Sequence, residues 1–379
     1  MKTHAITIAA VTAALATSAL AKKGKPAPEE EHPKVEVCFV LDTTGSMGGL
    51  IAGAKAKIWS IANDLTNAEP SPDLKISLVG YRDRGDAYIT KKFPLTDDLD
   101  AIYENLMKFQ AQGGGDGPES VNQGLAEAVN DMKWSGDKDT LKIIFLVGDY
   151  PPHMDYDNDV RYPETCKVAV KKDIIINTVQ CGNHGATTPV WKEIAHLSEG
   201  SFAAIEQEGG MAAIDSPVDG RIAELTREIN DTVIAYGTVE QQAVARSKVA
   251  AADSAPAATT AARSSYLGKK FAGKAISGSE DLVAEVAEGK VELEEVEGKE
   301  LPAEYSKLSK DELAKVVKEK SAEREKLIAE MDKLVAKRNE HVKKELARRK
   351  ADDKDDGFDA KIRGAVKEQG AKKGIDYKE

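Results

Sequence analysis

Between residues 35 and 237, strand-length apolar runs alternate regularly with helical patterns, and this alternation limits the folds open to the chain more than any other feature. Five runs are rich in Val and Ile, as expected for strands that are buried on both faces of a sheet. They are Val35–Leu41, Lys75–Tyr81, Leu141–Val147, Ile174–Gln180 and Ser201–Ile205. Helical crossovers between such strands give parallel pairing. The pattern therefore predicts a doubly wound, Rossmann-like α/β fold with a mostly parallel sheet.

The segments between these runs carry apolar residues that return every three or four positions, as on the buried side of an amphipathic helix. The predicted helices are Gly49–Leu65, Leu99–Phe109, Glu119–Met132, Arg161–Lys171, Pro189–Leu197 and Ile222–Ile234. We expect these helices to flank the sheet and the α/β domain to span residues 35–237.

The remainder of the chain has a different composition. Residues 238–265 turn to Ala, Ser and Thr with few bulky apolar side chains, which is typical of a linker. Residues 266–379 form a C-terminal region dominated by one long charged helix, which ends near Lys350 and opens with Ser309 and Glu312 in the spacing of a capping box. The apolar positions of this helix are sparse. This pattern is more typical of a solvated helix that packs through one narrow face than of a coiled coil.

Residues 1–21 have the pattern of a secretory signal peptide, in which Lys2 precedes an apolar run and the small residues Ala19 and Ala21 offer a cleavage point. A membrane anchor is the weaker interpretation, because the run is short and rich in Ala and Thr. We therefore expect a secreted or periplasmic protein that starts with a polar linker, residues 22–34. The 53 basic and 64 acidic side chains give a net charge of −11, which disfavours nucleic acid and anionic membranes as partners.

The chain holds three cysteines in 379 residues, too few for a scaffold stapled by disulfides. Cys38 lies within an apolar run, so we expect a buried, free thiol. Cys166 and Cys181 flank the connection between a predicted helix and the next strand. These two could pair if that helix packs on that strand, and the sequence leaves this open.

Two of the predicted strands end in an aspartate. The first leads into Asp42, Thr44 and Ser46, which place a carboxylate and two hydroxyls at alternate positions before a helix, and another ends at Asp149. In an open α/β sheet the carboxyl ends of the strands face the ligand crevice, so these groups meet at one edge. Hard divalent cations prefer such oxygen ligands. The sequence therefore predicts a divalent metal site at this edge.

A glycine-rich turn, residues 113–117, leads into the next helix and should reach the same crevice. The turn contains Asp116, and Pro118 follows at or near the first helical position. Alone, this arrangement indicates only the start of a helix with a capping aspartate. Beside the Asp42 motif, Asp116 becomes a further candidate metal ligand.

The spacing Asp42-x-Thr44-x-Ser46 after a first strand resembles the metal-ion-dependent adhesion site (MIDAS) of von Willebrand factor type A (VWA) domains, over about residues 35–237. The resemblance implies that this trio binds Mg²⁺, Mn²⁺ or Ca²⁺, with Mg²⁺ as the first candidate. It implies that a second-loop threonine contributes and that Asp149, in a third loop, ligates through water. It also implies a function in adhesion or another protein–protein interaction.

The sequence departs from the family pattern at two positions. Thr44 stands where serine is usual, which keeps the hydroxyl. Asp116 stands near the expected threonine, so three aspartates around one divalent ion would leave the site negatively charged. An acidic ligand group is then attracted less strongly, and cation binding with a partly structural role becomes the firmer expectation.

We expect a binding module rather than an enzyme, because the chain lacks a nucleophile–base set and a glycine-rich phosphate loop. The alternatives are a cell-envelope scaffold with a structural metal, and a metal-dependent hydrolase for which His153 is the nearest base. Two charged segments have structural interpretations. Residues 81–86 fit a salt-bridged loop better than the rim of a ligand site, and residues 153–159 fit a solvated acidic loop better than an EF-hand.

Overall fold

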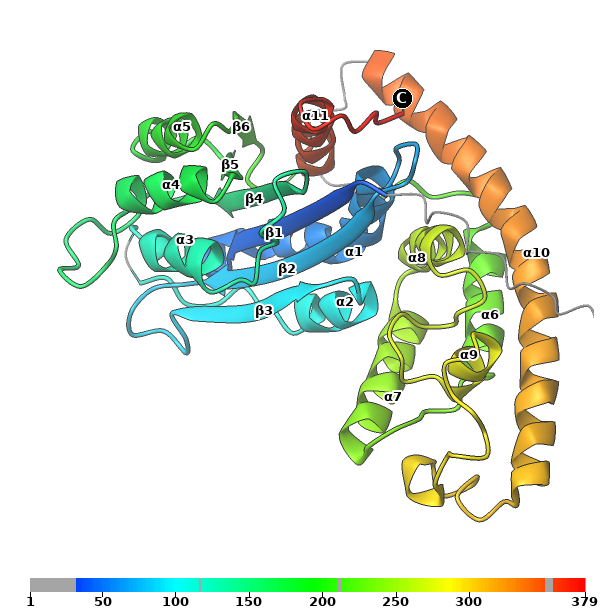
Figure 1. The fold of residues 1–379 in the computed structure, drawn as a ribbon. Helices are drawn as coiled ribbons and strands as arrows, with labels where there is room; N and C mark the ends of the chain where they lie inside the picture. The colour runs from blue at the N-terminus through cyan, green and yellow to red at the C-terminus, as the bar shows by residue number, and fades with distance from the viewer. Residues whose placement is uncertain (1–31, 116, 210–212, 352–356, 379) are drawn as a thin grey trace, which may run out of the picture. The chain divides into compact units, whose positions relative to one another are not determined.

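The computed structural model describes residues 32–115, 117–209, 213–351 and 357–378. At its centre is a six-stranded sheet with the strand order β3-β2-β1-β4-β5-β6 (Figure 1). The strands are β1 (Lys34–Asp42), β2 (Asp73–Tyr81), β3 (Thr90–Thr96), β4 (Leu141–Gly148), β5 (Ile174–Cys181) and β6 (Phe202–Ile205). β3 runs antiparallel to β2 and the other neighbours pair in parallel. The predicted mostly parallel α/β sheet is confirmed, whereas the predicted signal peptide, residues 1–21, lies outside the described residues.

The sequence pattern does not predict β3, because the strand contains two adjacent lysines and a proline and has no run of Val and Ile. The strand lies at the edge of the sheet, where only β2 pairs with it. Its pairing shifts register between Ile76 and Leu78, opposite Thr96 and Phe93, so Pro94 lies where the ladder is already irregular. Edge strands tolerate proline at such positions.

Six helices cover the two faces of the sheet. They are α1 (Gly48–Leu65), α2 (Leu99–Met107), α3 (Val121–Asn130), α4 (Tyr162–Lys171), α5 (Thr187–Leu197) and α11 (Phe358–Ala371). Helices α3, α4 and α5 pack on the face that carries Cys38 and Val40. Helices α1, α2 and α11 pack on the opposite face, around the stacked rings of Phe39 and Phe145. Both faces of the sheet are therefore buried, which explains its continuous Val and Ile runs.

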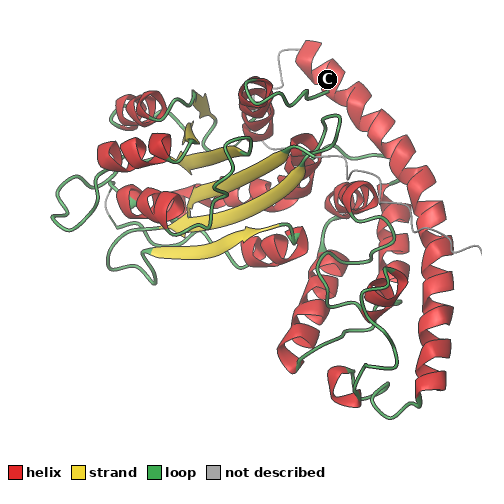
Figure 2. Cartoon of the chain, in the orientation of Figure 1, coloured by secondary structure: helices red, strands yellow, loops and turns green. Residues whose placement is uncertain are grey.

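The helix that we expected to complete the α/β domain does not lie on the sheet. Helix α6 (Asp219–Asn230) packs mainly against α8 and α10, through Ile222 and Leu225. The sheet face beside α1 is covered instead by α11, whose Phe358 amide donates to the carbonyl of Gly209 at 3.1 Å. Residues 213–351 are therefore inserted between β6 and α11. We call them the helical insert (Figure 2).

The remaining elements belong to the first loop and the helical insert. They are the short 3₁₀ helices η1 (Gly45–Met47) and η2 (Gly298–Glu300) and the helices α7 (Val239–Ser254), α8 (Ala257–Lys270), α9 (Leu282–Ala287) and α10 (Lys310–Ala351). Residues 238–265, which we predicted to be a linker, thus form α7 and part of α8 instead. Alanine is the strongest helix former, and Thr238 with Gln241 caps the start of α7.

The small side chains that suggested a linker form tight helix contacts. Four alanines of α7 and α8 are at most 1% exposed: Ala245, Ala252, Ala261 and Ala262. A small side chain lets neighbouring backbones approach closely, so a segment poor in bulky residues still buries its surface. The predicted boundary at residue 237 consequently falls inside the helical insert.

Helix α10 begins with the predicted capping box, in which the Glu312 carboxylate accepts the Ser309 backbone amide at 2.8 Å. It buries a narrow face against the insert, with Leu313 and Val317 in one cluster and Met331 in another. This is the single packed face that the sparse apolar pattern predicts. Pairing of α10 with a second chain as a coiled coil stays a prediction.

All three cysteines are buried free thiols, as expected for Cys38. The pairing of Cys166 with Cys181 does not occur. Cys166 belongs to the apolar cluster under α4 on one face of the sheet, and Cys181 points into the cluster on the other face. Successive strand residues alternate between faces, so the side of β5 that carries Cys181 turns away from α4.

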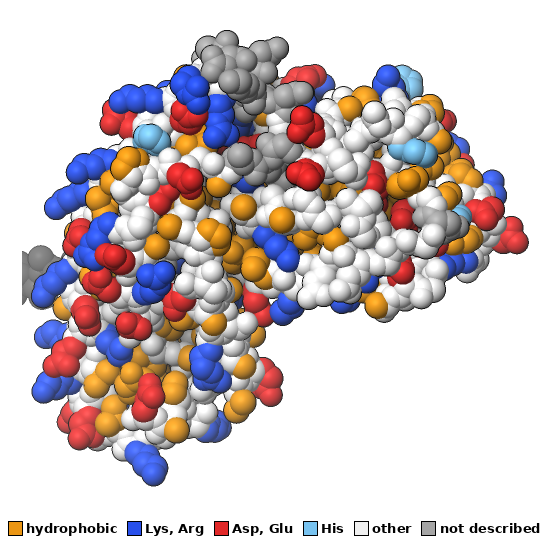
Figure 3. All heavy atoms as spheres, turned by 180° about the vertical axis from the view of Figure 1, so that it is seen from behind, with side chains coloured by type: hydrophobic (Ala, Val, Ile, Leu, Met, Phe, Trp, Pro, Cys, Tyr) orange, Lys and Arg blue, Asp and Glu red, His pale blue; other side chains and the backbone are white. Residues whose placement is uncertain are grey.

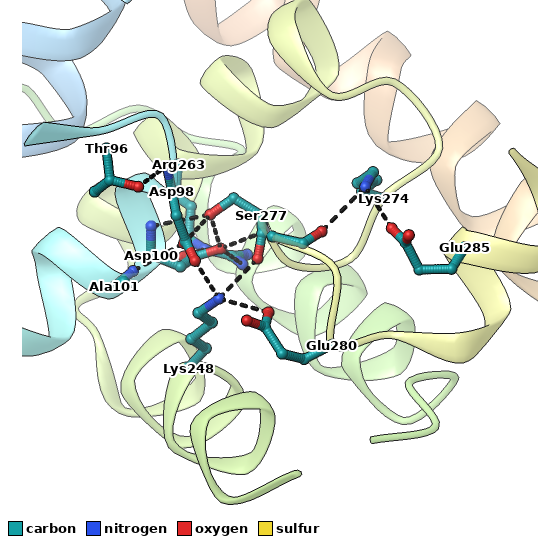
Figure 4. Close-up of polar contacts among 11 residues, drawn as sticks. Thr96, Asp98, Asp100, Ala101, Lys248, Arg263, Lys274, Ser277, Glu280 and Glu285 are labelled. Carbon is teal, nitrogen blue, oxygen red and sulfur yellow. Dashed lines mark hydrogen bonds and ion pairs between the residues drawn. The ribbon is translucent and has the colours of Figure 1, made fainter. Parts of the chain in front are cut away.

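A buried ionic network joins the helical insert to the start of α2 (Figure 4). The Lys248 side chain, which is fully buried, donates to Asp98 at 2.5 Å and to Glu280 at 2.8 Å. Arg263 forms a bidentate pair with Asp100 at 2.6 and 2.8 Å. Buried charges must find partners of fixed geometry. The network therefore fixes how α7 and α8 dock on α2.

Replacing Phe358 with alanine should destabilise the protein, because its ring packs edge-on against Phe39 in the core of the sheet. We expect a loss of about 3–5 kcal/mol in the free energy of unfolding, measured by urea denaturation. The matched control is Glu368→Ala on the exposed side of the same helix, for which we expect a change within about 0.5 kcal/mol. Equal effects would contradict the assignment of α11 to the core.

Replacing Lys248 with methionine should leave Asp98 and Glu280 without their buried cation. The expected loss of stability is about 3–5 kcal/mol by thermal or chemical denaturation. Arg246→Met removes an exposed positive charge from the same helix and should have little effect. A Lys248→Met protein as stable as this control would show that the network does not hold the insert in place.

Candidate metal centre

The site begins with two aspartates at the ends of neighbouring central strands. Asp42 is the last residue of β1 and Asp149 follows β4, and the register pairs Leu41 with Val147. Both side chains are buried, with Asp42 0% and Asp149 3% exposed. A Cβ atom on Gly148 would lie 3.3 Å from an Asp42 carboxylate oxygen and would overlap the Tyr81 hydroxyl. Glycine at this position therefore leaves room for the Tyr81 hydroxyl and the Asp42 carboxylate.

The predicted trio is assembled around Asp42. The Thr44 hydroxyl and backbone amide both donate to Asp42 Oδ1, at 2.6 and 2.8 Å. The Ser46 hydroxyl lies 3.3 Å from that of Thr44. One carboxylate and two hydroxyls thus converge at the end of β1, just before α1, as the spacing predicts.

Three carboxylate oxygens at this edge of the sheet are buried without a hydrogen-bond partner. They are Asp42 Oδ2, Asp149 Oδ1 and Glu119 Oε2. Buried polar atoms are almost always paired, and an unpaired carboxylate oxygen is costly. A hard divalent cation supplies what such oxygens lack. The donor set therefore fits the cation that the trio predicts.

The pKa values of Asp42 and Glu119 also show that their ionised forms are unfavourable in the absence of a cation. Burial raises the pKa of Asp42 to about 7; the Thr44 hydrogen bonds oppose this shift and the neighbouring charge of Asp149 adds to it. Burial also raises the pKa of Glu119 to about 9, with further contributions from Asp42, Asp83, Asp86 and Asp149. These carboxylates disfavour one another's charge when no cation lies among them.

Glu119 is the site residue that the sequence does not reveal, because its position just before α3 indicates only a helix start. Its backbone links the second and third loops, since its amide donates to Pro151 and its carbonyl accepts from His153. A Cβ atom on Gly114 would lie 3.0 Å from Glu119 Oε1 and 3.1 Å from Thr44 Cβ. The glycine-rich turn therefore allows the Glu119 carboxylate to approach the first loop.

Asp116, the second-loop residue that we predicted as a ligand, lies outside the described residues, so its role stays a prediction. The same turn is held from residues 81–86. Asp86 accepts the Gly114 amide at 3.0 Å, and buried Arg82 donates to the carbonyls of Thr43 and Gln110 at 3.1 and 2.7 Å. This segment thus holds the first two loops in place by hydrogen bonds to their backbone. Its Arg84 forms an ion pair with Asp159.

Gln207, after β6, is a second residue that the pattern does not indicate. Its side-chain amide donates to Asp149 Oδ2 at 2.8 Å and to the Ser46 carbonyl at 3.4 Å. It satisfies Oδ2 of Asp149, whereas Oδ1 is buried without a hydrogen-bond partner. No sequence signal marks this residue, because its contacts depend on how β6 ends.

The acidic loop at 153–159 is held by contacts among its own side chains. His153 pairs with Asp155 at 2.8 Å and stacks on Tyr156, with ring centroids 4.2 Å apart. Within the part of the chain that the structure describes, no three His, Cys, Asp or Glu side chains stand in position to ligate one ion. This also applies to Asp42, Asp149 and Glu119, so hydroxyl and water oxygens must complete the coordination of a cation there.

Residues 36–159 match the family model described as von Willebrand factor A domain. Over 97 residues the chain is 34% identical to "von Willebrand factor A domain-containing protein 7" of Rattus norvegicus, which covers 26% of this chain and 10% of that protein. Over 95 residues it is 30% identical to "N-acetyltaurine hydrolase" of Bos taurus, or 24% of this chain and 26% of that one. The chain thus spans a minor part of both relatives. It contains a von Willebrand factor A domain, and the resemblance seen in the sequence is confirmed.

Two solved structures match part of the chain at low similarity. One is proximal thread matrix protein 1 from the mussel byssus, with a zinc-occupied MIDAS motif, at 17% identity and a TM-score of 0.38 over 47% of this chain and 43% of that chain. The other is an aerotolerance-related membrane protein from Bacteroides fragilis, at 14% identity and a TM-score of 0.33 over 46% and 92%.

The chelated protein should lose stability as the pH rises. The folded-state pKa values of Asp42 and Glu119 lie above the ordinary values of 3.8 and 4.5. The stability that such groups contribute is complete below the unfolded pKa and is lost as the pH rises through the folded pKa. The free energy of unfolding should fall by at most about 1.4 kcal/mol per pH unit for each group, up to about pH 7 for Asp42 and about pH 9 for Glu119. Urea denaturation in chelator measures this slope; Mg²⁺ or Asp42→Asn should flatten it, and a flat profile in chelator would contradict the assignment.

Proposed function

We propose that this protein binds one divalent cation through Asp42, Thr44, Ser46 and Asp149 and uses the loops around the ion to contact a protein partner. The observation that carries the proposal is the set of buried, unpaired carboxylate oxygens beside two hydroxyls. All candidate ligands are oxygens, which favours a hard cation, with Mg²⁺ first and Ca²⁺ or Mn²⁺ as alternatives. When bound, the ion would offer a coordination position to a ligand atom, and the chain's own residues position the ion.

Binding to a protein partner is supported by the family, because von Willebrand factor A domains mediate protein interactions. On the face drawn in Figure 3, acidic and basic side chains are interspersed rather than gathered into one basic patch, which agrees with a partner other than nucleic acid. No helix among the described residues is long and apolar enough to cross a bilayer. A secreted or periplasmic location remains part of the proposal, as does the absence of membrane-spanning segments after cleavage of the signal peptide.

We further propose binding rather than catalysis. His153, the nearest candidate base, is tied to Asp155 and stacked on Tyr156. A general base must reach the water that the cation would activate. The contacts with Asp155 and Tyr156 hold the His153 ring within its own loop, which supports binding over catalysis. The cell-envelope scaffold is the second candidate, and it is supported by the helical insert, which offers a surface separate from the ion.

Cation binding is tested by isothermal titration of the chelated protein with Mg²⁺ and Mn²⁺. Asp42→Asn keeps the shape of the side chain and removes its charge, and we expect it to weaken binding about 100-fold or more. Asp97→Asn, at an exposed position before α2, is the matched control and should bind as the wild type does. Wild-type protein that binds neither cation would refute the metal site.

The protein partner is tested by affinity capture from the native envelope, with and without chelator, and again with Asp42→Asn. We expect capture that depends on the cation and fails for the variant. Capture that survives chelation and the variant but is lost on removal of residues 309–350 would support the scaffold instead.

A further inference from the structure

Glu119 occupies a position in the metal centre that neither the trio nor Asp149 accounts for. Its side chain is 2% exposed, and Oε2 is buried without a hydrogen-bond partner. The backbone contacts with Pro151 and His153 hold the residue between the second and third loops. A Cβ atom on Gly114 would lie 3.0 Å from Glu119 Oε1 and 3.1 Å from Thr44 Cβ, so the Glu119 carboxylate and Thr44 border the space that this glycine leaves open.

The local charge balance follows from this position. A bound cation favours the ionised form of each carboxylate, and the ionised Asp42, Asp149 and Glu119 together carry more negative charge than one divalent ion neutralises. Asp83 and Asp86 stand near enough to act on Glu119 as further negative charges. The buried guanidinium of Arg82, from the same segment, is turned to backbone carbonyls and to the ring of Tyr88. With the ion bound, the centre would therefore stay negative.

We propose that Glu119 is the third carboxylate of the cation site and that it makes the loaded site reject acidic ligand groups. The inference rests on the proposed function. Glu119 acts on the ion from the second loop, through water or by its charge, since the three carboxylates do not stand in position to ligate one ion directly. It is a specificity-determining residue.

The inference also defines the partner's chemistry. A carboxylate that approaches the ion must bring its negative charge beside Glu119, whereas a carbonyl or hydroxyl oxygen brings none. At short range and reduced dielectric, one extra charge changes affinity by at least about tenfold. The partner therefore meets the ion through a neutral oxygen, and acidic side chains are excluded.

The first experiment measures cation affinity by isothermal titration with Mn²⁺. Glu119→Gln keeps the size of the side chain and removes its charge, and we expect it to weaken binding about tenfold. Glu127→Gln is the matched control, because Glu127 lies in α3 and also has a buried oxygen without a hydrogen bond, but away from the trio. It should bind as the wild type does.

The second experiment uses acetate as the acidic probe. Water proton relaxation of the Mn²⁺-loaded protein reports displacement of water from the ion, with sodium chloride as the ionic-strength control. Acetate should displace water from Glu119→Gln at concentrations at least about tenfold lower than from the wild type. Glu119→Asp retains the charge, should still reject acetate, and gives a second folded variant if the glutamine variant does not fold.

The outcomes separate the two proposals. If the wild type binds no cation, the proposed function fails. If Asp42→Asn abolishes binding while Glu119→Gln matches the wild type in both cation affinity and acetate response, the metal site stands and the role of Glu119 is overturned. Acetate binding to the wild type as strong as to Glu119→Gln overturns the exclusion of acidic ligands.

Discussion

The parallel pairing of β1 with β4 is the constraint on which the rest of the molecule depends. It places these two strands at the middle of the sheet, buries both faces of each, and brings their carboxyl ends to the same level. Asp42 and Asp149 are consequently buried beside one another, where two negative charges are unfavourable without a cation. The strength of the apolar core thus supports an unfavourable polar cluster at its edge, as expected where a site is built for a ligand rather than for stability.

The surrounding loops hold this cluster in place through hydrogen bonds to their backbone groups. Arg82 fixes two carbonyls of the first and second loops, and Glu119 links the second and third loops through its own amide and carbonyl. Such contacts tolerate changes of neighbouring side chains while keeping the geometry of the ligands. The helical insert is held differently, by buried ion pairs at Lys248 and Arg263 that demand fixed partners. The loops at the edge of the sheet are therefore held by hydrogen bonds to the backbone, and the helical insert by buried ion pairs.

Sequence reasoning recovers what depends on local periodicity and fails where distant contacts decide. The buried strands, the trio at Asp42 and the capping box of α10 are written in short-range patterns, so they are predictable. Strand β3 is polar because it lies at an edge, and its pattern resembles a loop. Helices α7 and α8 are rich in alanine because they pack closely, and composition alone makes them resemble a linker. Glu119 and Gln207 join the site only through the way the loops close, for which the sequence carries no signal.

The contact between Phe358 and Gly209 has a consequence for how the chain can communicate. Because the insert leaves the sheet after Gly209 and the chain returns at Phe358, its entry and exit are one hydrogen bond apart. Gln207, which holds Asp149, lies two residues before that joint. A partner that binds only the helical insert would therefore act on the sheet at a point adjacent to the proposed cation site, and not at the far side of the sheet. Helix α10, through the insert, and Gln207, through the end of β6, are thus both connected to the joint between Gly209 and Phe358.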